Sequence, residues 1–276
     1  MQILIINLPR HSDRLAFQKA QMNRLGLHHQ LVDAVDAATL PDAVHQRLSL
    51  TWERPLRKAE VCCFLSHVNA WRAVVTSGQP ALVLEDDAVL AEGAPLLLDR
   101  LQALKDIDLA VLEIRGRKKI LGKRLRPLTP DFGLLDLFQD RTGSAGYVVW
   151  PSGAQKLLDK AHSGVAAPSD AFISSHYALR AMQVEPAAIV QLDMCEHYGL
   201  RAAAGGGSSI GIVGRPPIAS KARGLFIARR LVSQLRIGWR ILSVWHKAER
   251  RHVRLNPNQF SNASGADPTR IASLAK

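Results

Sequence analysis

The chain has 276 residues, 47% of them hydrophobic, which suffices to bury the core of one large domain or of a domain with an extension. Its three cysteines are odd in number and lack the paired Cys-x-x-Cys units of a zinc site, which argues against a disulfide framework and a structural zinc. No apolar run approaches the ~18 residues that a membrane-spanning helix requires. We therefore expect a globular protein of a reducing cytoplasm, with a first strand and not a signal peptide at its N-terminus.

The positive charge is confined to one part of the chain. The formal net charge is +12, yet residues 1–214 carry 23 Lys and Arg against 22 Asp and Glu. Residues 215–254 carry 11 basic residues and a single acid, Glu249. This asymmetry predicts a nearly neutral domain over residues 1–214 and a basic extension over residues 215–276.

The N-terminal segments predict a β–α–β unit. Residues 3–8 are apolar and β-branched, which is typical of a strand, and residues 31–37 resemble a second strand that runs into a loop. Between them, Ser12 or Asp13 is expected to cap the start of a helix that stops at Gly26. Two strands joined by a helix in this way indicate a parallel sheet.

The segment at residues 81–87 joins an apolar run to an acidic triplet. Residues 81–84 predict a strand buried on both faces, and Glu85, Asp86 and Asp87 follow at once. Adjacent carboxylates repel one another, and a divalent cation removes that cost. Ligands of such sheets bind beyond the carboxyl ends of the strands, and oxygen ligands suit Mg²⁺ or Mn²⁺. Taken alone, the triplet fits a solvated turn equally well.

The remaining segments predict further elements of both kinds. Residues 115–126 hold seven basic residues, which fits either a solvated loop or contact with the phosphates of an acidic substrate. Residues 205–209 are expected to form a flexible loop, which is weak evidence for phosphate binding. Helices are expected at residues 39–48, 60–77, 96–104, 153–158 (capped by Ser152) and 171–182, and strands at 109–114, 147–150 and 187–192.

Residues 223–254 predict a basic amphipathic helix. Leu225, Val232, Leu235 and Trp239 recur at a spacing of three, four or seven residues among many arginines. We favour the surface of an anionic bilayer as the partner of this helix. A helix packed on the body with its basic residues solvated is the second interpretation, and nucleic acid is disfavoured because the body has no matching basic, aromatic face.

Short motifs follow one another along residues 1–210, and the ordered set is far more specific than any member. They are Ile5-Ile6-Asn7-Leu8, Ser12-Asp13-Arg14, Ala34-Val35-Asp36, Ala59-Glu60-Val61-Cys62-Cys63-Phe64-Leu65-Ser66-His67 with Trp71, Leu84-Glu85-Asp86-Asp87, Gly146-Tyr147-Val148, Gly153-Ala154-Gln155-Lys156-Leu157-Leu158 and Pro168-Ser169-Asp170. The series resembles glycosyltransferase family 25, the lipooligosaccharide-biosynthesis glycosyltransferases. The chain departs from the family pattern at Ala59, Cys62 and Ala37, where the family has glycines.

The resemblance implies an α/β, GT-A-like fold with a Rossmann-like, mostly parallel central sheet flanked by helices. Residues 1–214 would form the catalytic domain, and residues 215–276 a basic amphipathic helical extension. The implied reaction is metal-dependent transfer of a hexose, usually galactose from UDP-galactose, onto a lipooligosaccharide or lipopolysaccharide core. Lipid A-linked acceptors are assembled at the cytoplasmic face of the bacterial inner membrane, which agrees with a peripheral protein that binds an anionic surface.

The resemblance also suggests roles for individual acids. Asp87 is expected to contact the divalent cation, Mn²⁺ or Mg²⁺, together with Glu85, while Glu85 or Asp86 binds the ribose or a metal-bound water. If the transfer inverts the anomeric carbon, a carboxylate must take the proton of the acceptor hydroxyl. Asp170 is the first candidate for this base and Glu60 the second, although Asp170 also fits a helix cap and Glu60 a helix start.

Besides Glu85 and Asp86, five residues are candidates for binding the nucleotide sugar. Asn7 and Arg14 are expected at the uridine or its phosphates, because a guanidinium matches phosphate with two hydrogen bonds. Asp36 is a candidate for the base or the ribose. Ser66 and His67 lie one helical turn before Trp71, and His67 fits contact with the donor as well as a buried structural role.

Two alternatives stay open. A nucleotidyltransferase shares the sheet and the acids, but it usually carries a glycine-rich loop with Lys or Arg directly after the first strand, and this chain has Pro9 and no glycine there. A catalytically inactive protein of the same fold that binds a membrane surface is the other, although the acid triplet and Asp170 are intact.

Overall fold

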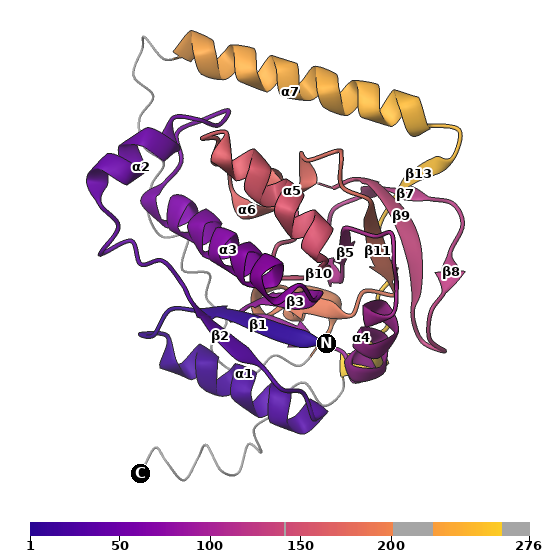
Figure 1. The fold of residues 1–276 in the computed structure, drawn as a ribbon. Helices are drawn as coiled ribbons and strands as arrows, with labels where there is room; N and C mark the ends of the chain where they lie inside the picture. The colour runs from indigo at the N-terminus through magenta and orange to yellow at the C-terminus, as the bar shows by residue number, and fades with distance from the viewer. Residues whose placement is uncertain (141, 201–222, 261–276) are drawn as a thin grey trace.

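The computed structural model describes residues 1–140, 142–200 and 223–260 and has an α/β fold, in which helices flank a mixed central sheet (Figure 1). The strands of the central sheet are β1 (Gln2–Asn7), β2 (Gln30–Asp33), β3 (Ala81–Glu85), β5 (Leu109–Val111), β7 (Lys119–Gly122), β8 (Arg126–Pro127), β9 (Gly133–Gln139), β10 (Gly146–Val149), β11 (Ala181–Glu185) and β13 (Ala248–Arg251). Their spatial order is β13-β7-β9-β11-β5-β10-β3-β1-β2, with β8 paired to β9. A small second sheet has the order β4 (Ala88–Leu90), β12 (Ile189–Gln191) and β6 (Glu113–Ile114).

The helices of the described residues lie around this sheet. The α-helices are α1 (Ser12–Leu25), α2 (Asp42–Ser49), α3 (Lys58–Ser77), α4 (Ala94–Gln102), α5 (Pro151–His162), α6 (Ser169–Ser174) and α7 (Arg223–Val244). Short 3₁₀ turns are η1 (Leu192–Met194), η2 (Glu196–Tyr198) and η4 (Pro257–Phe260). No described helix combines the length and the apolar character needed to cross a membrane.

The predicted β–α–β unit is present at the N-terminus. β1 pairs in parallel with both β2 and β3, with Leu4 opposite Gln30 and Ile3 opposite Leu82. α1 ends at Gly26, whose φ of 65° is the left-handed conformation that glycine adopts at helix ends. The predicted cap is wrong, because His11 precedes the helix and no side chain caps it.

The prediction of a mostly parallel sheet is wrong beyond β3. β10 lies between β3 and β5 and is antiparallel to both, and β9 is antiparallel to β7 and β11. Among the described residues, no helix separates the strands from β5 to β10 along the chain. These strands therefore lack the helical crossovers that make neighbouring strands parallel.

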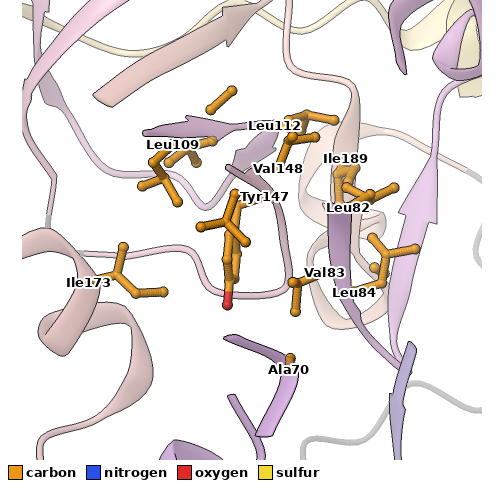
Figure 2. Packing of buried hydrophobic residues seen from close by; sticks show 14 of the residues in the cluster. Ala70, Leu82, Val83, Leu84, Leu109, Leu112, Tyr147, Val148, Ile173 and Ile189 are labelled. Atoms are coloured by element: carbon orange, nitrogen blue, oxygen red, sulfur yellow. The ribbon is translucent and has the colours of Figure 1, made fainter. Parts of the chain in front are cut away.

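The core is centred on β3, as predicted for a strand buried on both faces. Residues 81–84 have no exposed surface, and the neighbouring Tyr147 of β10 is equally buried. Figure 2 shows Tyr147 extending from β10 toward Ala70 of α3, among aliphatic side chains of the sheet. Ala59 and Cys62 lie within regular helix α3, so the backbone there does not require the glycines of the family pattern.

One helix prediction fails because the sheet takes the residues, and the cap predicted for another helix is wrong. The helix expected at 171–182 ends at Ser174, and residues 181–185 form β11 between β5 and β9. Ser152 lies inside α5, which follows Trp150 as its cap residue, and its Oγ donates to Asp108 Oδ1 at 2.7 Å. Pairing on both edges of β11 thus outweighs local helix preference.

The predicted helix at 223–254 is also shorter than expected. α7 ends at Val244, and β13 pairs antiparallel with β7. The segment is held there by Arg251, whose Nη2 donates to the buried Glu185 Oε2 at 2.8 Å. The predicted boundary near residue 214 and the loop at 205–209 lie outside the described residues.

Candidate functional site

A cavity of about 430 Å³ opens at the carboxyl end of β3. Five predicted residues line it: Glu85 and Asp87 at the end of β3, Arg14 from α1, Glu60 from α3 and Asp170 from α6. The other lining residues are Arg54, Cys63, Glu113, Arg115, Gly143, Ser144, Pro168, Ser169, Ala171, Gln191 and Asp193. The fold thus collects carboxylates and arginines from distant segments in one place.

The three consecutive acids point in two directions. Glu85 and Asp87 line the large cavity, whereas Asp86 lines a neighbouring cavity of about 160 Å³. Asp86 accepts hydrogen bonds from Asn7 Nδ2 (2.9 Å) and Arg14 Nη1 (2.8 Å). These bonds tie the end of β3 to β1 and α1, so both Asp86 oxygens are engaged by protein groups.

Glu85 ends a chain of hydrogen bonds that begins in the core. Trp71 Nε1 donates to Tyr147 OH at 2.8 Å, and Tyr147 OH lies 2.9 Å from His67 Nδ1. His67 Nε2 lies 3.3 Å from Glu85 Oε1, to which Ser144 Oγ also donates at 2.7 Å. Burial opposes ionisation of Glu85, but the bonds from His67 and Ser144 outweigh it and lower the pKa of Glu85. Glu85 is therefore held in place and charged.

Two carboxylate oxygens of the cavity are buried without a hydrogen-bond partner among the described residues, Asp87 Oδ1 and Glu113 Oε1. Burial, with the neighbouring charge of Glu85, raises the pKa of Asp87 to about 7. Burial and Glu85 likewise raise the pKa of Glu113 to about 8. Buried polar atoms without partners are costly, and a hard divalent cation satisfies such oxygens. The donor set therefore fits Mn²⁺ or Mg²⁺.

A second group of possible metal ligands lies beside these acids. Cys63, His67 and Glu85 each place one ligand atom within 4.8 Å of the others. Sulfur and nitrogen donors suit softer ions than Mn²⁺ or Mg²⁺. His67 Nε2 already faces Glu85, and Cys63 Sγ lies 3.2 Å from Ser169 Oγ, so this trio is engaged within the protein.

The two candidate bases differ in environment. Burial raises the pKa of Asp170, and its Oδ1 accepts a bond from Ala171 N at 2.7 Å. Glu60 is also desolvated, but two bonds from Arg54 (2.7 and 2.9 Å) and one from Arg57 N (2.8 Å) lower its pKa. A carboxylate with a raised pKa takes a proton more readily, which keeps Asp170 the first candidate for the base. The bonds of Glu60 at the start of α3 fit a capping role.

The smaller cavity lies between β1, the end of β2 and α3. Ser66, His67 and Arg14 line it, and their contact with a nucleotide stays a prediction. Ser66 Oγ donates to Cys62 O at 2.8 Å and accepts from Val35 N at 2.9 Å. Ser66 therefore joins α3 to the end of β2 and shapes the cavity wall.

Asn7 and Asp36 lie next to this cavity and do not line it. Asn7 is buried and engaged with Asp86. Asp36 is half-buried and pairs with Arg10, whose hydrogen bond lowers the pKa of the Asp36 carboxyl. Both residues therefore hold the segments beside the cavity in place, and a direct contact of either with a nucleotide stays a prediction.

Glu113, Ser144 and Asp193 were not predicted, and Arg115 was predicted only as part of the basic stretch 115–126 that could contact phosphates. Glu113 and Arg115 alternate with apolar residues at the end of a strand, a signal that resembles ordinary β-alternation. Arg115 pairs with Asp193 through two bonds of 2.7 and 3.2 Å. Gly143, with a φ of 105°, lets the loop before β10 pass Glu113 and deliver Ser144 to Glu85.

Fold and site together define an α/β protein whose central strand delivers carboxylates to a cavity suited to a divalent cation and an anionic ligand. The chain belongs to glycosyltransferase family 25. The family model, described as "Glycosyltransferase family 25 (LPS biosynthesis protein)", matches residues 1–173, a range that includes every predicted site residue.

The chain is similar to longer animal proteins. It is 28% identical over 190 residues to human procollagen galactosyltransferase 2, covering 64% of this chain and 30% of that protein. It is equally 28% identical over 193 residues to the mouse inactive glycosyltransferase 25 family member 3, covering 62% of this chain and 31% of that protein. The chain thus spans less than a third of either relative and resembles proteins named as active and as inactive.

Similarity to solved structures is remote. The inositol-1-phosphate CTP transferase of T. maritima aligns over 83% of this chain and 95% of its own, with 10% identity and a TM-score of 0.41. A Drosophila β1,4-galactosyltransferase 7 variant in complex with manganese, UDP-galactose and xylobiose aligns over 79% and 81%, with 10% identity and a TM-score of 0.36. Neither similarity decides the reaction of this chain.

Proposed function

We propose that the protein is a GT-A-like galactosyltransferase that uses Mn²⁺ or Mg²⁺ to transfer galactose from UDP-galactose to a lipooligosaccharide or lipopolysaccharide core. The observation that carries the proposal is the pair of buried oxygens without protein partners, Asp87 Oδ1 and Glu113 Oε1, in a cavity that also holds Arg14. Relatives named galactosyltransferases support the sugar, and the family description supports the acceptor. Residues 1–214 form the catalytic part in this proposal, and the extension over 215–276 adds β13 to its sheet.

The donor is assigned across the two cavities. The nucleoside occupies the smaller cavity, and the diphosphate lies at the border, because Arg14, Cys63 and Glu85 line both cavities. Asp87 and Glu113 would hold the divalent cation, with Glu85 in the same wall. When bound, this cation stabilises the charge that develops on the departing diphosphate.

Asp170 is assigned as the base of an inverting transfer. The acceptor oxygen forms a bond to the anomeric carbon while the bond from that carbon to the diphosphate breaks, and the electron pair leaves with the diphosphate. The hydroxyl proton passes to the Asp170 carboxylate, whose pKa is raised by burial. Arg54 holds Glu60 away from this role by pairing with both of its oxygens.

The test is release of UDP from UDP-galactose with Mn²⁺, with and without a truncated core acceptor. Asp87→Asn should lower turnover by about a hundredfold or more, because a lost metal ligand removes charge stabilisation in the transition state. Asp136→Asn, at a half-exposed carboxylate on β9, is the matched control and should leave turnover unchanged. Full turnover by Asp87→Asn would show that the metal assignment is wrong.

An inactive protein of the same fold is the second candidate, because an equally similar relative is named inactive. It predicts that UDP and Mn²⁺ bind while no nucleotide sugar is cleaved. A nucleotidyltransferase predicts instead the release of pyrophosphate from a nucleoside triphosphate. The loop after β1, residues 8–11, contains no glycine, which disfavours that reaction.

An anionic membrane surface is the proposed partner of α7. Nine of the thirteen large hydrophobic side chains exposed among the described residues lie between residues 225 and 245. Leu235 and Trp239 are each 73% exposed, whereas Arg229 and Arg240 bind backbone carbonyls of the body. An outward apolar face beside basic residues fits a bilayer with anionic headgroups, here the cytoplasmic face of an inner membrane.

Vesicle sedimentation of the whole chain tests this partner. The protein should pellet with vesicles that contain phosphatidylglycerol and stay in solution with phosphatidylcholine alone. Replacing Leu235 and Trp239 by Glu should abolish pelleting, while Leu96→Glu, at an exposed leucine of α4, should not. Equal pelleting of both variants would refute the assignment. Deleting the whole extension is a poor test, because the deletion would remove β13 from the sheet.

A further inference from the structure

A third cavity, of about 380 Å³, lies beneath α7. α7 supplies Arg230 and Gln234, the loop before α3 supplies Trp52 and Arg54, and Tyr177 follows α6. Figure 1 shows α7 as a long helix above α2 and α6. The cavity therefore lies between the C-terminal extension on one side and the catalytic part on the other.

This cavity continues the proposed active site. Arg54 and Ala171 line both the 430 Å³ cavity and the cavity beneath α7. A small cavity of about 30 Å³, lined by Asp170, Gln139 and Tyr177, lies at the same junction. Asp170, the candidate base, thus lies between the 430 Å³ cavity and the cavity beneath α7. The smaller cavity assigned to the nucleoside shares no lining residue with the cavity beneath α7.

Two arginines of α7 bind this helix to the body of the protein on either side of the cavity. Arg229 Nη1 donates to the carbonyl oxygens of Leu50 and, at 3.2 Å, of Trp52. Arg240 Nε donates to Phe138 O at 3.2 Å, and its guanidinium lies 5.4 Å from the centre of the Tyr177 ring. The cavity is therefore a built feature and not a loose gap between helix and body.

The lining has the chemistry of a saccharide site with a positive charge. Two half-buried aromatic residues, serine hydroxyls and side-chain amides offer the stacking faces and hydrogen bonds that sugar rings use. Arg54 is paired with Glu60 and Asp140 with Lys119, and Glu53 is the other carboxylate of the lining. No carboxylate of the described residues pairs with Arg117 or Arg230. These two guanidinium groups are available to an anionic ligand.

We propose that the cavity beneath α7 is the acceptor subsite and that it takes an anionic saccharide, one that carries a phosphate or carboxylate group. This assignment rests on the proposed transferase function, because it places the acceptor hydroxyl at Asp170. Arg117 and Arg230 bind the anionic group, and the rings of Trp52 and Tyr177 border the sugar. The outer, apolar face of α7 then lies on the side from which a lipid-linked saccharide arrives.

The test is calorimetric titration of the whole chain with lipid-free oligosaccharides. The probes are a phosphorylated core oligosaccharide, the same oligosaccharide after phosphatase treatment, a carboxylated oligosaccharide and a collagen-like peptide. Replacing Arg117 and Arg230 together by Ala should weaken binding of the anionic probes about a hundredfold, at about tenfold per charge-assisted contact. Arg236→Ala, at an exposed arginine of α7 outside the cavity, is the matched control and should bind as the wild type does.

The phosphorylated and carboxylated probes identify the source of the charge, and preference for either over the dephosphorylated probe supports the proposal. Unchanged binding by the double variant, equal binding of the dephosphorylated probe, or binding of the peptide alone would overturn it. Hydrolysis of UDP-galactose is measured on the same samples. If the wild type binds the oligosaccharide but does not hydrolyse UDP-galactose, the transferase function is refuted and the anionic-saccharide site is still supported.

Discussion

Mn²⁺ binding to the free protein should weaken about a hundredfold when the pH falls from about 8.5 to about 6.5, because Asp87 and Glu113 must lose protons before they bind a cation. The pKa of Asp87 is about 7 and that of Glu113 about 8. At about pH 6.5 the protonated form then exceeds the ionised form about threefold at Asp87 and about thirtyfold at Glu113. At about pH 8.5 Asp87 is ionised and Glu113 largely so.

The assay is calorimetric titration of Mn²⁺ in two buffers with different ionisation enthalpies, which measures the affinity and the number of protons released. Near pH 6.5 binding should release between one and two protons. Glu113→Gln removes one of the two titrating groups, so its affinity should change only about fourfold over the same range. Asp136→Asn should behave as the wild type does. An affinity that does not depend on pH in the wild type would refute the reasoning.

Three further predictions concern the same site. Asp87→Asn should raise the melting temperature of the metal-free protein by about 5 °C or more at pH 8 and not at pH 4, because the folded pKa exceeds the ordinary 3.8 and stability is lost as the pH rises through about 7; calorimetry measures this. Asp170→Asn should lower kcat by about 10²–10⁴ with UDP affinity unchanged, measured by kinetics and titration. Glu60→Gln should lower the melting temperature by a few degrees and keep kcat within about threefold, because its carboxylate caps α3 and pairs with Arg54.

The first half of the fold follows from local patterns. The apolar run before Glu85, the helix that ends at Gly26 and the parallel pairing of β1 and β2 all follow from apolar periodicity and helix-end signals. β10 and β11 do not, because their orientation depends on which strands they reach and not on their own residues. Pairing along both edges then outweighs the helical pattern that residues 171–182 show in isolation.

The part of the site at the end of β3 was predictable, because carboxylates there interrupt an apolar pattern. Three consecutive carboxylates after an apolar strand attract attention, and Asp87 and Glu85 do line the cavity. No site role could be predicted for Glu113, because a single acid between Leu112 and Ile114 is typical of an ordinary polar position in a strand. Its burial beside Glu85 arises only when β6 and β3 come together, so its raised pKa is a tertiary property.

The orientation of α7 shows what apolar periodicity leaves open. The pattern establishes that an apolar face exists, and burial on the body is its usual fate. Here the helix buries only Phe226 and Val244, each contributing about 1.5–3 kcal/mol at most, while eight large apolar side chains of α7 stay exposed. Such a surface needs a partner in water. A second copy of the same face would bring like charges together, because residues 215–254 carry 11 basic residues and one acid. The proposed anionic bilayer would meet both the apolar and the basic side chains, and the saccharide of a lipid-linked acceptor would reach the cavity beneath α7 from that side.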